Sequence, residues 1–123
     1  MEKSFIGEKF QSLGENRFNR TIICHCLRED FKKAFGKPWK FSVRKTSGSG
    51  IQIEIKQMPK KELNQAFEKW TNFIHPENFN NSATFNKLEE LGHAYNYDRS
   101  DAQTDYFDCN YYLTWDVSNI KYI

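Results

Sequence analysis

Hydrophobic residues recur every three to four positions over residues 20–35, and this spacing predicts a helix. Ile23, Leu27 and Phe31 share one face of that helix, so we expect this face to be buried. Gly36 follows the pattern directly and is suited to end the helix, because glycine accepts the left-handed backbone conformation. The charged residues of the segment fall on the other faces, where solvent can reach them.

Hydrophobic and polar residues alternate in two segments that flank a turn rich in Gly and Ser. Residues 39–44 and 51–56 both show a period of two, which is typical of strands with one buried face. The connecting residues 47–50, Ser-Gly-Ser-Gly, favour a tight turn. Together they predict a β-hairpin whose apolar face has to be covered by a helix.

The rest of the chain is expected to add two helices and a strand. One helix is expected from Pro59 to Ile74, and another over about 84–94, capped by Ser82 or Thr84. Residues 107–117 alternate almost without interruption, so we expect one long strand with one buried and one solvent-exposed face.

These elements predict an α+β fold. The expected sheet has three antiparallel strands, the hairpin plus the long C-terminal strand, and packs on about three helices. Residues 1–18 are expected to form an N-terminal arm or a short helix, and residues 19–123 a single α+β domain. A length of 123 residues suits one domain with a real hydrophobic core.

Charge is distributed unevenly along the chain, although the net charge is only +2. Residues 1–61 contain 14 Lys and Arg against 6 Asp and Glu, whereas residues 62–123 contain 4 against 10. Such a split indicates contact with a nucleic acid or another polyanion. The alternative is that the two halves simply attract each other within one fold.

Three cysteines offer little chemistry. Cys24 and Cys26 flank His25, but neighbouring helical residues point about 100° apart, so the three cannot share one metal ion. We expect Cys26 to pack inward, His25 to lie on the surface, and Cys109 to be an unreactive core residue. No secretion signal is evident at residues 1–7, so a cytoplasmic location is expected.

Basic residues gather on the first helix and on the outward face of the hairpin, a placement that could follow a phosphate backbone. Tyr106 and Tyr112 are the outward aromatic residues best placed to stack on bases. The residues predicted to bind a nucleic acid or a partner are Arg28, Lys32, Lys33, Lys40, Arg44, Lys45 and Lys56.

An acidic segment before the last strand has several interpretations. Its members are Tyr97, Asp98, Ser100, Asp101, Thr104, Asp105, Tyr106 and Asp108. The Asp spacing of three, four and three would line one face of a helix, where oxygen ligands could hold a divalent cation. The same residue types also cap turns, and we prefer that role, with Ser100 as a cap. A third possibility is an acidic strip that pairs with a basic partner.

Two stretches carry a resemblance to a known family. Phe31–Phe35, followed by Lys40–Arg44 and the Ser/Gly turn, resembles the large polyvalent protein-associated domain of phages and conjugative elements. Tyr95–Asp108 is similar to a signature of related mobile-element proteins. Relatives often carry a Trp-Thr-Asp-Gly-Pro turn after the second strand, of which only Pro59 is present here.

The resemblance implies a phage or mobile-element protein with an anti-defence role, such as inhibition of a CRISPR effector. We therefore expect a non-enzymatic protein that binds a host RNA-guided nucleoprotein, or its RNA, through the basic surface. No cofactor, metal or membrane contact is expected. The alternatives are a metal-dependent nucleic-acid-processing accessory that uses Asp98–Asp105, and a structural interaction module of a mobile element.

Overall fold

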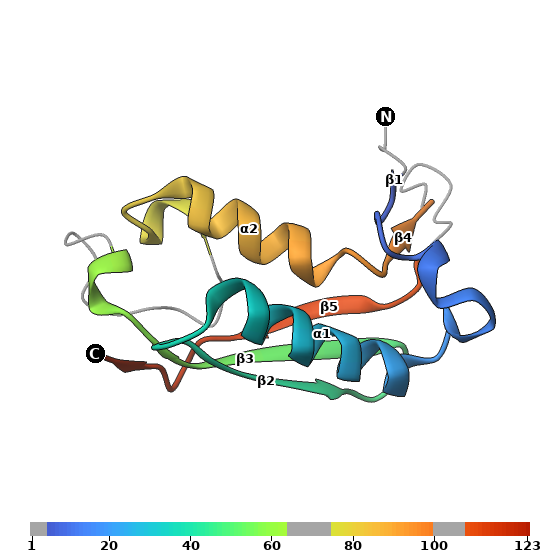
Figure 1. Cartoon of the computed structure of the whole chain (residues 1–123), viewed down its shortest axis with the longest axis horizontal. Coiled ribbons are helices and arrows are strands. Elements are labelled where there is room, and N and C mark those ends of the chain that lie inside the picture. Colours follow the sequence, from blue (N-terminus) through green and yellow to red (C-terminus); the bar gives the residue numbers. More distant parts are fainter. Residues whose placement is uncertain (1–4, 64–74, 100–107) are drawn as a thin grey trace.

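The computed structural model describes residues 5–63, 75–99 and 108–123. It has an α+β fold in which the helices α1 (Arg20–Phe35) and α2 (Ser82–Gly92) lie on one side of a four-stranded sheet (Figure 1). The predicted fold class is confirmed, but the predicted arrangement of the sheet is wrong.

The hairpin is formed by β2 (Lys40–Lys45) and β3 (Gly50–Met58), as predicted. Gly48 adopts a φ of 73° in the connecting turn, a conformation that glycine accepts without steric cost. The strand order is β2-β3-β5, so β2 forms an edge of the sheet and β3 its centre.

The last long strand pairs in the opposite sense to the prediction. Strand β5 (Tyr112–Asp116) is parallel to β3, with Ile53 opposite Trp115, and the short β6 (Lys121–Tyr122) is also parallel to β3. The sheet is therefore mixed rather than antiparallel. The physical reason is that the chain crosses over the sheet through α2 before it returns, which is how parallel neighbours are joined. Strand β5 is also shorter than the predicted 107–117 strand.

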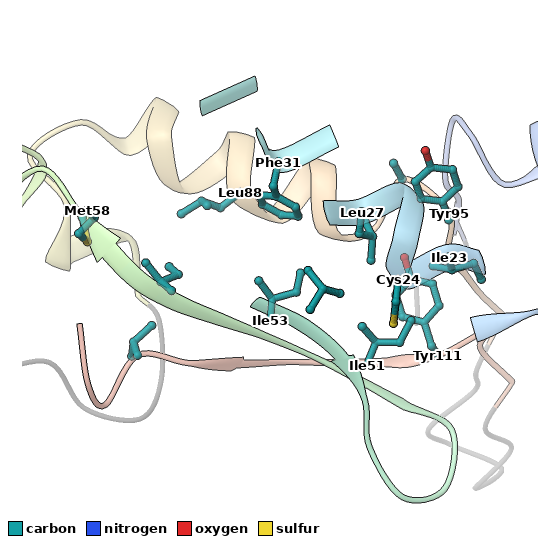
Figure 2. Close-up of a cluster of buried hydrophobic side chains, with 14 of the residues drawn as sticks. Ile23, Cys24, Leu27, Phe31, Ile51, Ile53, Met58, Leu88, Tyr95 and Tyr111 are labelled. Atoms are coloured by element: carbon teal, nitrogen blue, oxygen red, sulfur yellow. The ribbon is translucent and has the colours of Figure 1, made fainter. Parts of the chain in front are cut away.

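Helix α1 supplies one side of the core. Asn19 caps it, because its side-chain oxygen accepts hydrogen bonds from the backbone N–H groups of Thr21 and Ile22. Leu27 and Phe31 have no exposed surface and face the isoleucines of β3 in Figure 2. The predicted helix and its buried face are confirmed.

Cys24 is the more deeply buried of the two cysteines in α1, and Cys26 packs against the core from its edge, as predicted. The core stripe of α1 runs through residues 23, 24, 27 and 31, so Cys24 is 2 % exposed (Figure 2). Cys26 is only partly buried, and His25 lies on the surface as expected.

The two later helices differ from their predictions. Helix α2 is capped by Asn81, whose side chain accepts from the N–H of Ala83, rather than by Ser82 or Thr84. Leu88 of α2 is fully buried. Pro59 does not begin an α-helix: Lys60–Glu62 forms one turn of 3-10 helix, and Leu63 is extended. The remainder of that predicted helix, 64–74, lies outside the described residues.

The segment before α1 runs along the chain that follows α2. Strand β1 (Phe5–Ile6) pairs with β4 (Tyr97–Asp98), and a 3-10 helix covers Gln11–Asn16. Gly7 sits against backbone, since an added Cβ there would overlap the carbonyl groups of the two residues that precede Tyr95. The glycine is therefore needed for close approach.

Candidate functional site: a basic groove beside the edge strand

A groove of about 700 Å³ opens between the C-terminal half of α1 and the start of β2. Gly36 creates it locally: its φ of 58° ends α1, and its carbonyl accepts a hydrogen bond from the N–H of Trp39 at 3.0 Å. This turn brings the chain directly from the helix into the edge strand, so the side chains of both elements line one recess. The lining residues are Arg28, Glu29, Lys32, Gly36, Lys37, Trp39, Lys40, Phe41 and Lys56.

Five cations and one carboxylate line this groove. Glu29 is the carboxylate. Within residues 5–63, 75–99 and 108–123, none of the five cations lies at ion-pair distance from an acidic side chain. A concave surface with a large excess of charge of one sign attracts ions of the opposite sign strongly. The groove is therefore suited to an anionic ligand.

Lys32 has a structural role as well. It lies in the last turn of α1, where a positive charge compensates the partial negative charge of the exposed helix carbonyls. This contribution is worth a few tenths of a kcal/mol to about 1 kcal/mol and does not require the ammonium group to be paired. Lys32 can therefore stabilise the helix end and still contact a ligand.

Arg28 ties α1 to the outer edge of β2. Its Nη2 donates a hydrogen bond of 2.7 Å to the backbone carbonyl of Val43. A free strand edge exposes unpaired backbone groups that another strand can pair with. Arg28 covers one of these groups, so an added strand would have to displace it.

Lys56 reaches the groove through an irregularity in the hairpin. Lys40 lies opposite Gln57 and Phe41 opposite Ile55, which leaves Lys56 as an extra residue between them. Such a bulge redirects side chains relative to the regular alternation. The sequence prediction also placed Lys56 on the outward face, but it did so from the regular alternation of residues 51–56 and not from a bulge.

An aromatic cluster forms the apolar part of the groove. The rings of Trp39 and Phe41 are parallel, with an interplanar angle of 3° and centroids 5.6 Å apart. Phe35 packs on both, at 4.9 Å from Trp39 and 5.5 Å from Phe41. The cluster continues into the core through Phe31, whose ring lies 4.8 Å from that of Phe41.

The structure brings together four of the seven predicted basic residues, and adds Lys37. The other three lie elsewhere. Lys33 lines a small recess beside Asp30 and Leu91, and Lys45 is at the far end of β2. Arg44 projects from the sheet, where its Nη2 donates to Gln52 Oε1 at 2.6 Å.

Tyr112, one of the two predicted stacking tyrosines, does not line the groove. Tyr112 is 51 % exposed, but it belongs to β5, and β3 lies between β5 and the edge strand. Tyr106 lies outside the described residues. Trp39 lines the groove, and it is partly buried against the core in the connection that precedes β2. Lys37 and Trp39 occupy an irregular connection, where periodicity carries no information about orientation.

The described part of the acidic segment forms a local hydrogen-bonded structure. Asp108 accepts a hydrogen bond from Tyr97 Oη at 2.9 Å and forms an ion pair with Arg99 at 3.1 Å. Burial and the bond to Asp108 raise the pKa of Tyr97. Asp98 lies in β4, so it is not part of the helical face that the Asp spacing would allow as an alternative to turn capping.

The other predicted members of this segment are Ser100, Asp101, Thr104, Asp105 and Tyr106, which lie outside the described residues. Elsewhere, among the described side chains, no three His, Cys, Asp or Glu residues come close enough together to hold a metal ion.

The thiols of Cys24 and Cys109 are poorly suited to nucleophilic chemistry. Burial raises the pKa of Cys24, and it also raises the pKa of Cys109. A thiol whose pKa is raised stays protonated at neutral pH, and the thiolate is the reactive form. Cys109 is partly buried opposite Asp98, ahead of β5.

Comparison with known proteins adds no identification: no family model, curated protein or solved structure matches this chain. The resemblance to the large polyvalent protein-associated domain therefore stays a prediction. No helix in the described ranges combines the length and apolar character needed to cross a membrane.

Proposed function

We propose that this chain is a non-enzymatic binding protein whose groove holds the phosphate backbone of a nucleic-acid strand. The observation that carries the proposal is the convergence of Arg28, Lys32, Lys37, Lys40 and Lys56 on one recess without acidic partners among the described residues. Lys and Arg bind phosphates through charge, and each contact releases counterions from the nucleic acid.

An acidic protein segment is the main competing ligand for such a groove. An extended peptide would be expected to add to the edge of β2 through its backbone. Arg28 already occupies the Val43 carbonyl at that edge, so strand addition would first have to break a charge-assisted hydrogen bond of 2.7 Å. A phosphate backbone needs only the cations, which makes nucleic acid the better fit.

The wider role in this proposal is that of an anti-defence protein. The strand would then be the RNA of a host nucleic-acid-targeting nucleoprotein, such as a CRISPR effector. This part rests on the resemblance of Phe31–Phe35, Lys40–Arg44 and Tyr95–Asp108 to mobile-element proteins.

Fluorescence anisotropy with a short labelled single-stranded RNA tests the binding proposal. The test variant is Lys37→Gln/Lys40→Gln/Lys56→Gln, which removes three cations from the groove. The matched control is Lys33→Gln/Lys45→Gln/Lys60→Gln, which removes the same charge from exposed lysines outside it. The groove variant is expected to bind at least about tenfold more weakly at low salt, and the control to stay within about threefold of the parent.

The salt dependence gives a second readout. If all five cations contact phosphates, log K falls with log salt at a slope of about −3.5, at about −0.7 per contact with a single strand. The groove variant should show about −1.4. Equal losses in both variants, or no binding by the parent protein at low salt, would contradict the proposal.

A further inference from the structure

The aromatic part of the groove indicates which form of nucleic acid it takes. We propose that the ligand is single-stranded and that one of its bases stacks on the ring of Trp39, while the flanking phosphates contact the surrounding cations. This inference rests on the proposed function, since it concerns the same groove.

Trp39 is held in place by a stack that reaches the core. Its ring is parallel to that of Phe41 and packs on Phe35. Phe31, which has no exposed surface, contacts both Phe35 and Phe41 with centroids at 6.0 Å and 4.8 Å. A ring that is fixed in this way loses little conformational entropy when a base packs against it.

Cations line the same groove as this ring. Lys37 and Lys40 flank Trp39 along the chain, and Arg28 and Lys32 line the recess from α1. Proteins that bind single strands combine aromatic side chains, on which bases stack, with positive charges that follow the backbone. Both components are present here in one groove.

A duplex does not fit this arrangement as well. Its bases are stacked on one another, so their faces are not available to Trp39 until the helix is opened, which costs free energy. A duplex backbone can be bound by cations alone, without an aromatic ring among them. In this chain the cations instead line a recess with an aromatic ring in it.

The test compares two single-stranded oligonucleotides of equal length, one with bases and one abasic, because they carry the same phosphates. The strand with bases is expected to bind about tenfold more tightly or better, as stacking on one aromatic side chain typically contributes. A duplex of the same sequence should bind more weakly than the single strand. Binding should also quench tryptophan fluorescence.

Two variants separate stacking from folding. Trp39→Leu is expected to remove the advantage of the strand with bases while leaving the abasic strand unaffected. Trp39→Phe keeps a ring, so it should keep most of the advantage while losing the fluorescence change. Circular dichroism of each variant checks that it is folded. If Trp39→Leu does not fold, the comparison of Trp39→Phe with the parent protein still shows whether the fluorescence change comes from Trp39.

Each outcome separates this inference from the proposed function. If the abasic strand binds as tightly as the strand with bases, or the duplex binds more tightly, the groove binds phosphates and the stacking inference is wrong. If neither oligonucleotide binds and an acidic polyglutamate peptide does, both proposals fail and the groove is a protein-binding site. An equal loss of both oligonucleotides in Trp39→Leu would also overturn the stacking role.

Discussion

Replacement of Arg28 tests the link between the groove and the sheet edge. Its Nη2 is 2.7 Å from the Val43 carbonyl, and a hydrogen bond from a charged donor is worth about 1.5–3 kcal/mol when it is shielded from water. Arg28 itself is exposed, so water can replace part of the bond. We therefore expect Arg28→Met to lower the free energy of unfolding by about 1.5 kcal/mol, the lower end of that range.

The same change removes one cation from the groove. The slope of log K against log salt should become shallower by about 0.7, so raising the salt from about 50 to 200 mM should weaken binding about 2.6-fold less than in the parent protein. Arg28→Lys keeps the charge but not the planar guanidinium. It should therefore keep the salt slope while losing most of the stabilisation that the hydrogen bond to Val43 provides. Methionine retains an apolar stem of similar reach, so loss of packing is largely controlled.

Urea denaturation and anisotropy measured over a series of salt concentrations give the two quantities. An unchanged free energy of unfolding in Arg28→Met would show that the Val43 contact does not stabilise the fold. A slope in Arg28→Lys that falls as far as in Arg28→Met would show that the charge of Arg28 does not act on the ligand.

Two further predictions concern the fold. Gly7→Ala should detach the N-terminal segment, because the added Cβ overlaps the backbone of His93 and Ala94. Phe10 would then lose its burial, so we expect the free energy of unfolding, measured by urea denaturation, to fall by about 2 kcal/mol, with exposed Glu8→Ala as the neutral control. An unaltered stability of Gly7→Ala would refute the close approach. Burial raises the pKa of Tyr111, so above about pH 10 only the unfolded chain loses this proton and stability falls as the pH rises. Denaturation of Tyr111→Phe at pH 10 to 12 should therefore show a free energy of unfolding that falls less steeply with pH, by up to about 1.4 kcal/mol per pH unit. If the pH dependence of the variant equals that of the parent protein, Tyr111 does not cause the fall.

Local patterns predicted the first helix and the hairpin because the relevant information lies within a few residues. The spacing of Ile23, Leu27 and Phe31 marks the buried face of α1 whatever it packs against. The direction of β5 is different, because the alternation of Leu113 and Trp115 with polar residues is the same for a parallel and an antiparallel strand. The direction depends on where the chain re-enters the sheet after α2, which is a property of the whole fold.

The groove could be predicted only in part for a similar reason. Charge alone selected Arg28, Lys32, Lys40 and Lys56, but it also selected cations that the fold places elsewhere, such as Arg44. Which cations enter the groove depends on the turn after α1 and on the bulge in the hairpin, and neither of these has a periodic signal in the sequence. A tryptophan next to lysines in the connection that follows Gly36 is the signal that could have been used.

NMR can locate the bound strand on the protein directly. A ¹H–¹⁵N spectrum of the protein, titrated with a short single-stranded RNA at low salt, should show shifts concentrated at Arg28, Lys37, Trp39 and Lys56, including the indole N–H of Trp39. Shifts centred instead on Arg44 and the outer face of the sheet, or a spectrum that does not change, would show that the groove is not where the strand binds.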